Sequence, residues 1–164
     1  MFELFSDSAR KVIFLSRCEA GRLKFESIDL QHLLLGFILE DQGLAELQLR
    51  KALGIDQPEL VNVPGIQLKN SFLSRDTATK LREIFSGVGS LSEAQALYGD
   101  MPLTEAATSA LSASVEHARG SVVSPLHILW AMFNDEQNSV TRYLVENGVT
   151  REQVESAIRD PGAL

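Results

Sequence analysis

Apolar residues recur every three or four positions over most of this chain, while the alternating pattern of a strand is scarce. From Ser6 onward this spacing predicts a helix with one buried face. Ser6 is a suitable N-cap, and Asp7 adds negative charge to the first turn. The residues of the predicted buried face are Ala9, Val12, Ile13, Ser16, Ala20 and Leu23. The sequence therefore predicts an all-α protein.

The same pattern occurs twice. Residues 5–20 match residues 103–118, so that the segment Cys18-Glu19-Ala20 aligns with Glu116-His117-Ala118. Each copy then passes through a short loop into a similar run, residues 28–36 in the first and 123–131 in the second. Repeated units of this kind bury their apolar faces against each other. Two copies predict a closed pair related by pseudo-twofold symmetry.

The second helix of each copy should begin at Asp29 or Ser124, which are both good N-caps, and Pro125 suits the first helical position. Residues 33–39 are apolar nearly all round, and residues 128–133 match them. A helix without a polar face is buried on all sides. We therefore expect this helix to be central.

A third and a short fourth helix should complete each copy. The third helix ends at a glycine, Gly54 or Gly148, that can adopt the left-handed C-cap conformation. Thr150 is a suitable N-cap for the last helix. The expected bounds are 43–53 and 58–61 in the first copy, and 139–146 and 151–158 in the second.

Residues 62–101 have no counterpart in either copy and form either a packed helical insertion or a partly mobile arm. Helices are expected over about 74–85 and 92–98. Four basic residues stand out here and could dock on the acidic lobes of the same chain, which we favour, or on an acidic partner: Lys69, Arg75, Lys80 and Arg82. We divide the chain into a first repeat (1–61), an inter-repeat insertion (62–101) and a second repeat (102–164), together one compact domain.

The net charge of −7 argues against non-specific binding of nucleic acid, which needs Lys and Arg to displace counterions. No apolar run approaches the roughly 20 residues that span a bilayer, and nothing resembles a signal peptide. We expect a cytoplasmic protein without nucleic-acid or membrane partners. The single Cys18 excludes an intramolecular disulfide, and its place in the helical pattern predicts a small buried side chain.

Residues that could carry chemistry are few. His32 and His127 occupy equivalent positions near a helix start, where we expect each ring to bond a neighbouring backbone group. His117 is expected on a solvated helix face, without further metal ligands at useful spacing. No phosphate loop occurs, and Cys18 has no evident base. The sequence therefore predicts a non-enzymatic protein with no catalytic, metal or cofactor site.

Two acidic pairs, at positions 40–41 and 135–136, fall at matching expected helix ends. We expect them to keep a turn soluble; the alternative is an acidic edge that faces a partner. Trp130 and Phe133 are expected in the core because their equivalents, Leu35 and Ile38, are apolar.

One family shares this order of motifs. The order Phe-Ser/Thr-x-x-Ala-x-x-x-Ile/Leu, then x-x-His-Leu/Ile-Leu-Leu-Gly, then acidic-x-Gly-x-Ala resembles the Clp repeat, found in the amino-terminal domain of Clp-type AAA+ unfoldases, especially of the ClpC and ClpA kind. The match covers roughly residues 2–61 and 102–158. It implies two four-helix repeats about a pseudo-twofold axis. The signature positions that it implies are structural: His32, His127, Gly36, Gly54 and Gly148.

In the unfoldases this domain receives adaptors and substrates above the ATPase ring. The resemblance therefore implies a protein-interaction module, an adaptor or modulator of a Clp-type AAA+ protease. Its partners would be Clp ATPase or peptidase subunits, adaptors or substrates. Two alternatives stay open: an excised N-terminal domain of a Clp ATPase, and a phosphate or phosphopeptide sensor. The polar ending of the chain and its long connection favour a free-standing protein.

ClpC-like members bind phosphorylated arginine in each repeat, through a Glu before the signature His and a Ser/Thr at the first helix start. Carried over to this chain, the Ser/Thr positions are Ser6 and Thr104, whereas the Glu positions hold Gln31 and Leu126. Only a carboxylate grips a guanidinium bidentately. Phosphoarginine binding should therefore be weak.

Restoring a carboxylate should strengthen that binding. A solvent-accessible charge-assisted pair contributes on the order of 1 kcal/mol or more, so Gln31→Glu should tighten binding by about fivefold. Leu126→Glu should help less, since Pro125 and the apolar neighbourhood place the carboxylate poorly. Calorimetry of the parent and both variants with free phosphoarginine checks this. A parent that already binds in the low micromolar range would contradict it.

Overall fold

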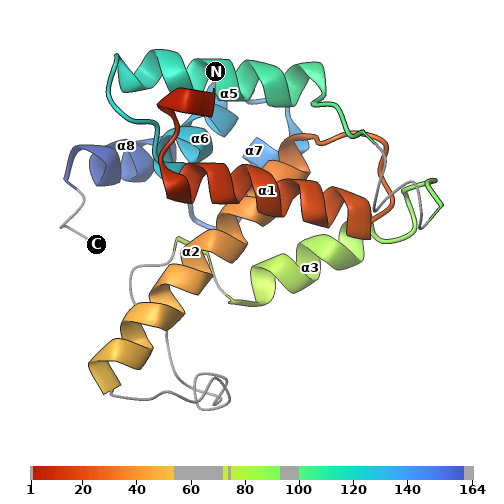
Figure 1. The fold of residues 1–164 in the computed structure, drawn as a ribbon, viewed down its shortest axis with the longest axis horizontal. Coiled ribbons are helices and arrows are strands. Elements are labelled where there is room, and N and C mark those ends of the chain that lie inside the picture. The colour runs from red at the N-terminus through yellow and green to blue at the C-terminus, as the bar shows by residue number, and fades with distance from the viewer. Residues whose placement is uncertain (1, 54–71, 74, 93–99, 161–164) are drawn as a thin grey trace.

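The computed structural model describes residues 2–53, 72–73, 75–92 and 100–160. Within these residues the protein is all-α, as predicted, with two isolated β-bridges and no strand (Figure 1). None of the described helices is long and apolar enough to cross a membrane. The helical segments are η1 (Phe2–Leu4), α1 (Asp7–Arg22), α2 (Leu30–Leu53), α3 (Arg75–Phe85), α5 (Glu105–Ala118), α6 (Pro125–Ala131), η3 (Met132–Asn134), α7 (Ser139–Glu146) and α8 (Arg151–Arg159).

Helix α2 is the centre of the fold, as its apolar pattern predicted. It contacts α1, α3, α5, α6 and α7. Its first half is buried on all sides through Leu33, Leu34, Leu35, Phe37 and Ile38. Burial of this much apolar surface is the main favourable term in folding.

The predicted N-caps are confirmed. Ser6 Oγ accepts a hydrogen bond from the Ala9 N–H at 3.1 Å, and Thr104 Oγ1 accepts one from the Ala107 N–H at 3.2 Å. Thr150 caps α8. The buried faces of α1 and α5 also follow the predicted spacing, with the exception discussed below for position 18.

The two repeats exchange backbone hydrogen bonds reciprocally. Phe5 forms a parallel β-bridge with Val123, and Ile28 forms one with Leu103. Phe5 aligns with Leu103, and Ile28 aligns with Val123. Exchanging the repeats therefore maps one bridge onto the other, which is the property of an isologous twofold contact. This reciprocity supports the predicted pseudo-twofold arrangement.

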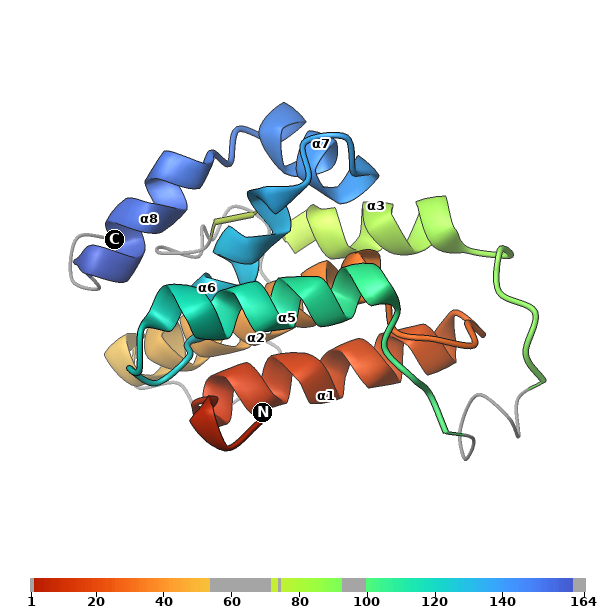
Figure 2. The same ribbon diagram turned by 90° about the horizontal axis from the view of Figure 1, so that it is seen from above.

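Helix α3 has the same kind of neighbours in the first repeat as α8 has in the second. α3 packs against α2, α8 packs against α6, and the two lie towards opposite ends of the molecule (Figure 2). Arg82 of α3 donates two hydrogen bonds, of 2.8 and 2.9 Å, to Glu19 of α1. Glu155 of α8 lies 3.0 Å from the ring of His117, which aligns with Glu19. The expected docking of the basic cluster on the same chain is thus observed for Arg82.

The predicted break before a third helix in the first repeat is wrong. α2 runs without interruption from Leu30 to Leu53. Glu40, expected at an exposed turn, lies inside this helix, is 2% exposed and pairs with Lys11 at 3.1 Å. In the second repeat the chain does break, because Asn138 accepts a hydrogen bond from the Val140 N–H and starts α7. The first repeat has Gly43 where this cap stands.

Two side chains differ from their predicted exposure. Cys18 is exposed, because it falls two positions after Ser16 and so lies off the stripe of residues three and four apart. His117 is only 18% exposed and is not on a solvated face, because Trp130 covers its ring. Trp130 itself is half-buried, whereas Phe133 lies in the core as predicted. The helix expected over 58–61, residues 93–98 of the helix expected over 92–98, the cap at Gly54 and the basic residue Lys69 lie outside the described residues.

Two glycines have conformational reasons. Gly148 has φ +78°, the left-handed C-cap predicted for α7. Gly36 lies where α2 crosses α1, so that a Cβ there would overlap Ser16 Oγ and the backbone oxygen of Val12. The equivalent residue in the second repeat is Ala131. Helices α1 and α2 therefore approach each other closely at this glycine.

Gly36→Ala should lower the free energy of unfolding by about 2 kcal/mol, because the added methyl group meets backbone atoms that cannot move away alone. Gly43→Ala is the matched control in the same helix. Its Cβ would meet nothing within 4 Å, so it should raise stability by about 0.5–1 kcal/mol. Urea unfolding of both variants measures this, and equal stabilities would contradict the close approach.

Candidate protein-interaction site

The reciprocal bridges place the first-helix N-cap of each repeat beside the second-helix start of the other. The Ser6 N–H donates to the Val123 carbonyl at 2.9 Å. Thr104 Oγ1 donates to Asp29 Oδ1 at 2.8 Å, and the Leu30 N–H donates to the same oxygen at 2.8 Å. The Ser/Thr positions singled out in the sequence thus contact the opposite repeat.

A pocket of about 510 Å³ opens at Thr104. Its lining includes three carboxylates, from Asp29, Glu105 and Asp135, and no basic side chain among the described residues. Because the hydroxyl hydrogen of Thr104 is used by Asp29, it is not free to bond a phosphate. The pocket therefore favours a cationic group over an anion.

The two repeats differ at this pocket. Ser109 and Asp135 line it, and their equivalents in the first repeat are Lys11 and Glu40. Lys11 Nζ lies 3.1 Å from Glu40 Oε2, so an ion pair spans the corresponding position between α1 and α2. The open acidic pocket belongs to the second repeat.

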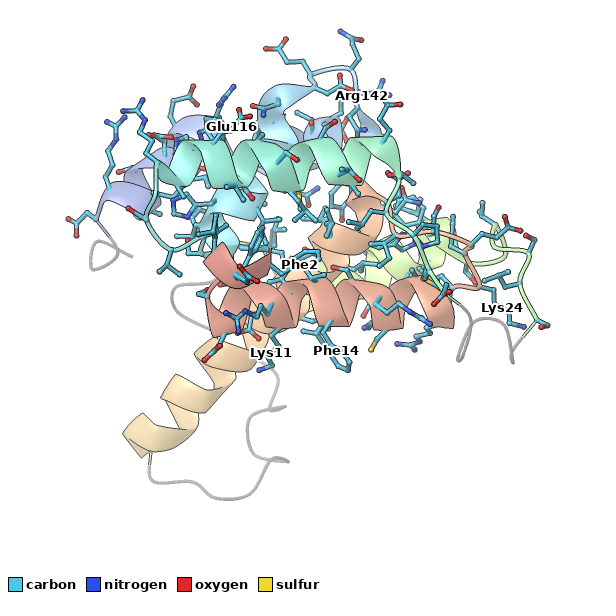
Figure 3. All side chains as sticks on the ribbon, turned by 45° about the horizontal axis from the view of Figure 1, so that its top comes forward. Phe2, Lys11, Phe14, Lys24, Glu116 and Arg142 are labelled. Atoms are coloured by element: carbon cyan, nitrogen blue, oxygen red, sulfur yellow. The ribbon has the colours of Figure 1, made fainter. Side chains whose placement is uncertain are left out.

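Large apolar side chains are exposed at the Ser6 end. We define the apolar patch as Phe2 (45% exposed), Leu4 (47%) and Val122 (63%). The Val123 N–H donates to the Leu4 carbonyl at 2.8 Å, which holds the two segments together. Phe14 is also exposed, but it lies on the side of α1 that faces away from α5 (Figure 3). Contiguous exposed apolar groups mark interaction sites in folded proteins.

Gln31 and Leu126 occupy the positions where ClpC-like members have a glutamate, and their surroundings differ. Gln31 is half-buried in the first turn of α2. Leu126 is half-buried and packs against the hydrophobic core. Neither position places a carboxylate beside Ser6 or Thr104.

The two signature histidines bond the backbone at the start of their helices. His32 Nδ1 accepts a hydrogen bond from the Asp29 N–H at 3.0 Å, and His127 Nδ1 accepts one from the Ser124 N–H at 3.1 Å. Burial lowers the pKa of His32 to about 4. Burial and then the charge of His117 lower the pKa of His127. Within the described residues, no group of three or more His, Cys, Asp or Glu side chains could hold a metal ion.

A cluster around Trp130 was missed by sequence reasoning. The ring of His117 stacks on Trp130 at 3.7 Å, and the Arg151 guanidinium lies 4.2 Å from the centre of the Trp130 ring. Partial burial alone would raise the pKa of Glu155, but its partners Arg159 and His117 lower it. The members come from α5, α6 and α8, so no sequence spacing links them. These contacts hold α8 against α5 and α6 within the second repeat.

Comparisons with known proteins agree on one family. The model of the Clp repeat N-terminal domain matches residues 4–146. A probable ATP-dependent Clp protease ATP-binding subunit of Chlamydia pneumoniae is 31% identical over 150 residues, which are 90% of this chain and 15% of that protein. The chain therefore spans only a small part of that relative.

Two solved structures share the fold. The N-terminal domain of the caseinolytic-protease-associated chaperone ClpD from Arabidopsis thaliana matches with a TM-score of 0.60 and 24% identity, over 96% of both chains. The Hsp104 N-terminal domain from Candida albicans matches with a TM-score of 0.61 and 18% identity, over 98% of this chain and 93% of that one.

Acid should destabilise the protein through His32. The folded state keeps this ring neutral down to pH about 4, whereas the unfolded chain takes up a proton below pH about 6.5. Stability from this group is therefore complete above pH 6.5 and is lost as the pH falls towards 4. Between pH 7 and pH 4.5 the loss is on the order of 2 kcal/mol. His32→Gln should unfold with a correspondingly shallower pH dependence in urea titrations. Parallel curves for the two proteins would contradict it.

Proposed function

This chain belongs to the Clp repeat N-terminal domain family, and we propose that it is a non-enzymatic adaptor or modulator of a Clp-type AAA+ protease. It acts by binding protein partners. Those partners are subunits of the Clp ATPase or peptidase, or substrates delivered to them. The family membership supports a Clp-associated role, and the exposed surfaces support binding as the means.

The apolar patch is the observation that carries this proposal. Phe2, Leu4 and Val122 are each more than two-fifths exposed, although exposing such side chains to water is unfavourable. The bridge between Phe5 and Val123 fixes the patch at the junction of the repeats, so a partner meets a preformed surface. A preformed surface loses little conformational entropy on binding.

A second candidate is the N-terminal domain of a larger Clp ATPase. The C. pneumoniae relative supports it, because that ATP-binding subunit contains a matching segment within a much longer chain. The same patch would then receive partners for an attached ATPase ring. Reading the gene beyond Leu164 distinguishes the two candidates.

A phosphate sensor is the weakest candidate. At Thr104 a phosphate would meet the carboxylates of Asp29, Glu105 and Asp135. At the Ser6 end the nearby cations are already engaged, Arg10 with Asp7 and Lys11 with Glu40. The negative charge of a phosphate would be repelled by these carboxylates, which opposes its binding.

Immobilised protein should retain Clp ATPase or peptidase subunits from the native lysate, as identified by mass spectrometry. Val122→Asp should reduce that retention at least about tenfold, because a charge in an apolar contact must be desolvated without a partner. Val88→Asp is the matched control, a valine of similar exposure (65% against 63%) in the connection between the repeats. Equal loss in both variants, or no Clp subunit retained by the parent, would refute the proposal.

A further inference from the structure

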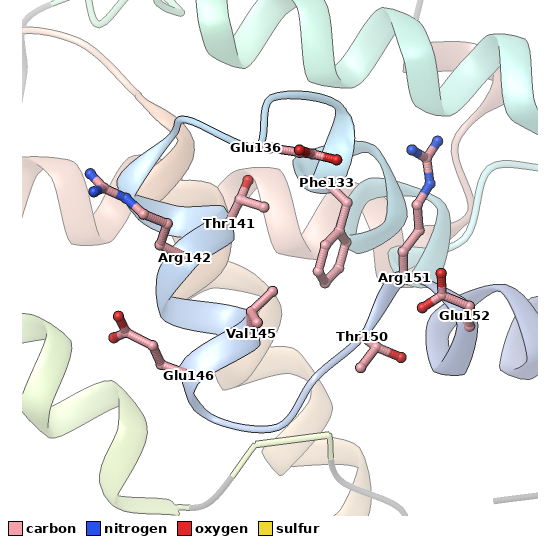
Figure 4. Close-up of a pocket in the computed structure, with 9 residues that line it drawn as sticks. All are labelled: Phe133, Glu136, Thr141, Arg142, Val145, Glu146, Thr150, Arg151 and Glu152. Atoms are coloured by element: carbon pink, nitrogen blue, oxygen red, sulfur yellow. The ribbon is translucent and has the colours of Figure 1, made fainter.

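A second pocket, of about 540 Å³, lies in the second repeat between η3, α7 and α8 (Figure 4). We call it the α7–α8 pocket. We propose that it docks a partner segment in which a large apolar side chain is flanked by lysine or arginine. This rests on the proposed function, since it presumes that the chain binds proteins, but it concerns a site separate from the apolar patch.

Two apolar side chains, Phe133 and Val145, line this otherwise polar pocket. The ring of Phe133, 6% exposed, lies next to Val145, which is 57% exposed. Thr141 also lines the pocket, but its hydroxyl donates to the Met132 carbonyl at 2.6 Å and so is already satisfied. An apolar side chain from a partner would cover Val145 and Phe133 without leaving the Thr141 hydroxyl unpaired.

The rim carries a net negative charge, because three carboxylates and two guanidinium groups line the pocket. Glu136, Glu146 and Glu152 line the pocket and are exposed, and none of them forms an ion pair with a described residue. The two guanidinium groups belong to Arg142 and Arg151. That of Arg151 is held over Trp130 and donates to Asn134 Oδ1 at 3.1 Å. That of Arg142 points away from Phe133 (Figure 4).

The position of Glu146 strengthens this preference for a cation. It is the last residue of α7, whose last turn contains no basic residue. The carbonyl groups at a helix C-terminus carry partial negative charge, so a carboxylate there is unfavourable and a cation is favourable. A lysine or arginine from a partner would offset the charge of the Glu146 carboxylate and the partial negative charge of the carbonyl groups at this helix end. Complementary charge of this kind selects partners and orients them.

The probe is a capped peptide of sequence Gly-Lys-Lys-Leu-Lys-Lys-Gly, titrated into the full chain labelled with nitrogen-15. Amide shifts should move at Val145, Glu146 and Thr150, with a Kd on the order of 0.1–1 mM for so small a contact. Glu146→Lys should weaken binding at least about fivefold and Val145→Ser at least about threefold. Peptides with Glu in place of Lys, or Gly in place of Leu, should not bind measurably.

Matched controls separate this site from general charge effects. Glu83→Lys and Val88→Ser make the same chemical changes at exposed positions outside the second repeat and should leave Kd within about twofold. Shifts centred on Thr104, or equal weakening by Glu83→Lys, would overturn the proposal. So would a concentration-dependent dimer that Glu146→Lys abolishes, because the occupant would then be a second copy of this chain.

Failure here is distinct from failure of the proposed function. If the chain retains Clp subunits through Val122 but the peptide does not bind, only the α7–α8 pocket is excluded. If the peptide binds as expected while no Clp subunit is retained, the pocket stands and the Clp partnership fails.

Discussion

Each repeat of this protein leaves backbone groups that the other repeat satisfies. The Ser6 N–H precedes α1 and finds its acceptor at Val123, while the Thr104 N–H precedes α5 and finds its acceptor at Ile28, both at 2.9 Å. Buried backbone groups without a partner are costly, so neither repeat is complete alone. The bridges also fix where the two second-helix starts lie. The central placement of α2, with its apolar surface on all sides, depends on this exchange.

Within that shared frame the repeats solve the same problems with different chemistry. Glu19 of α1 pairs with Arg82 of α3, and His117 of α5 pairs with Glu155 of α8. The carboxylate therefore belongs to the earlier helix in the first pair and to the later helix in the second. The carboxylate of Glu40 is buried against Lys11, whereas its equivalent, Asp135, is exposed. Twofold geometry is therefore retained while the surfaces diverge, and the two pockets described above both involve the second repeat.

The fold could be predicted because its signals are local. Caps such as Ser6 and Thr104, the helical spacing of apolar residues, and the alignment of the two copies each act within a few residues or by direct comparison. Prediction failed where a distant partner decides the outcome. Nothing near Glu40 in sequence shows that Lys11 will hold it inside a helix. The candidate sites were mostly missed for the same reason. Thr104 and Asp29 line one pocket, and Phe133 and Glu152 line another, only in the folded chain.

Individual carboxylates differ in whether the chain itself supplies their partners. In the first repeat Glu19 and Glu40 are buried and paired, and Asp41 accepts the Phe72 N–H at 3.1 Å. In the second repeat Glu146 stands exposed at a helix C-terminus, where folding gains nothing from it. A residue that is locally unfavourable for folding is more often found at a functional site than elsewhere, because folding selects residues that stabilise their own helix and its packing. The proposed docking of a cationic segment would give this carboxylate a partner.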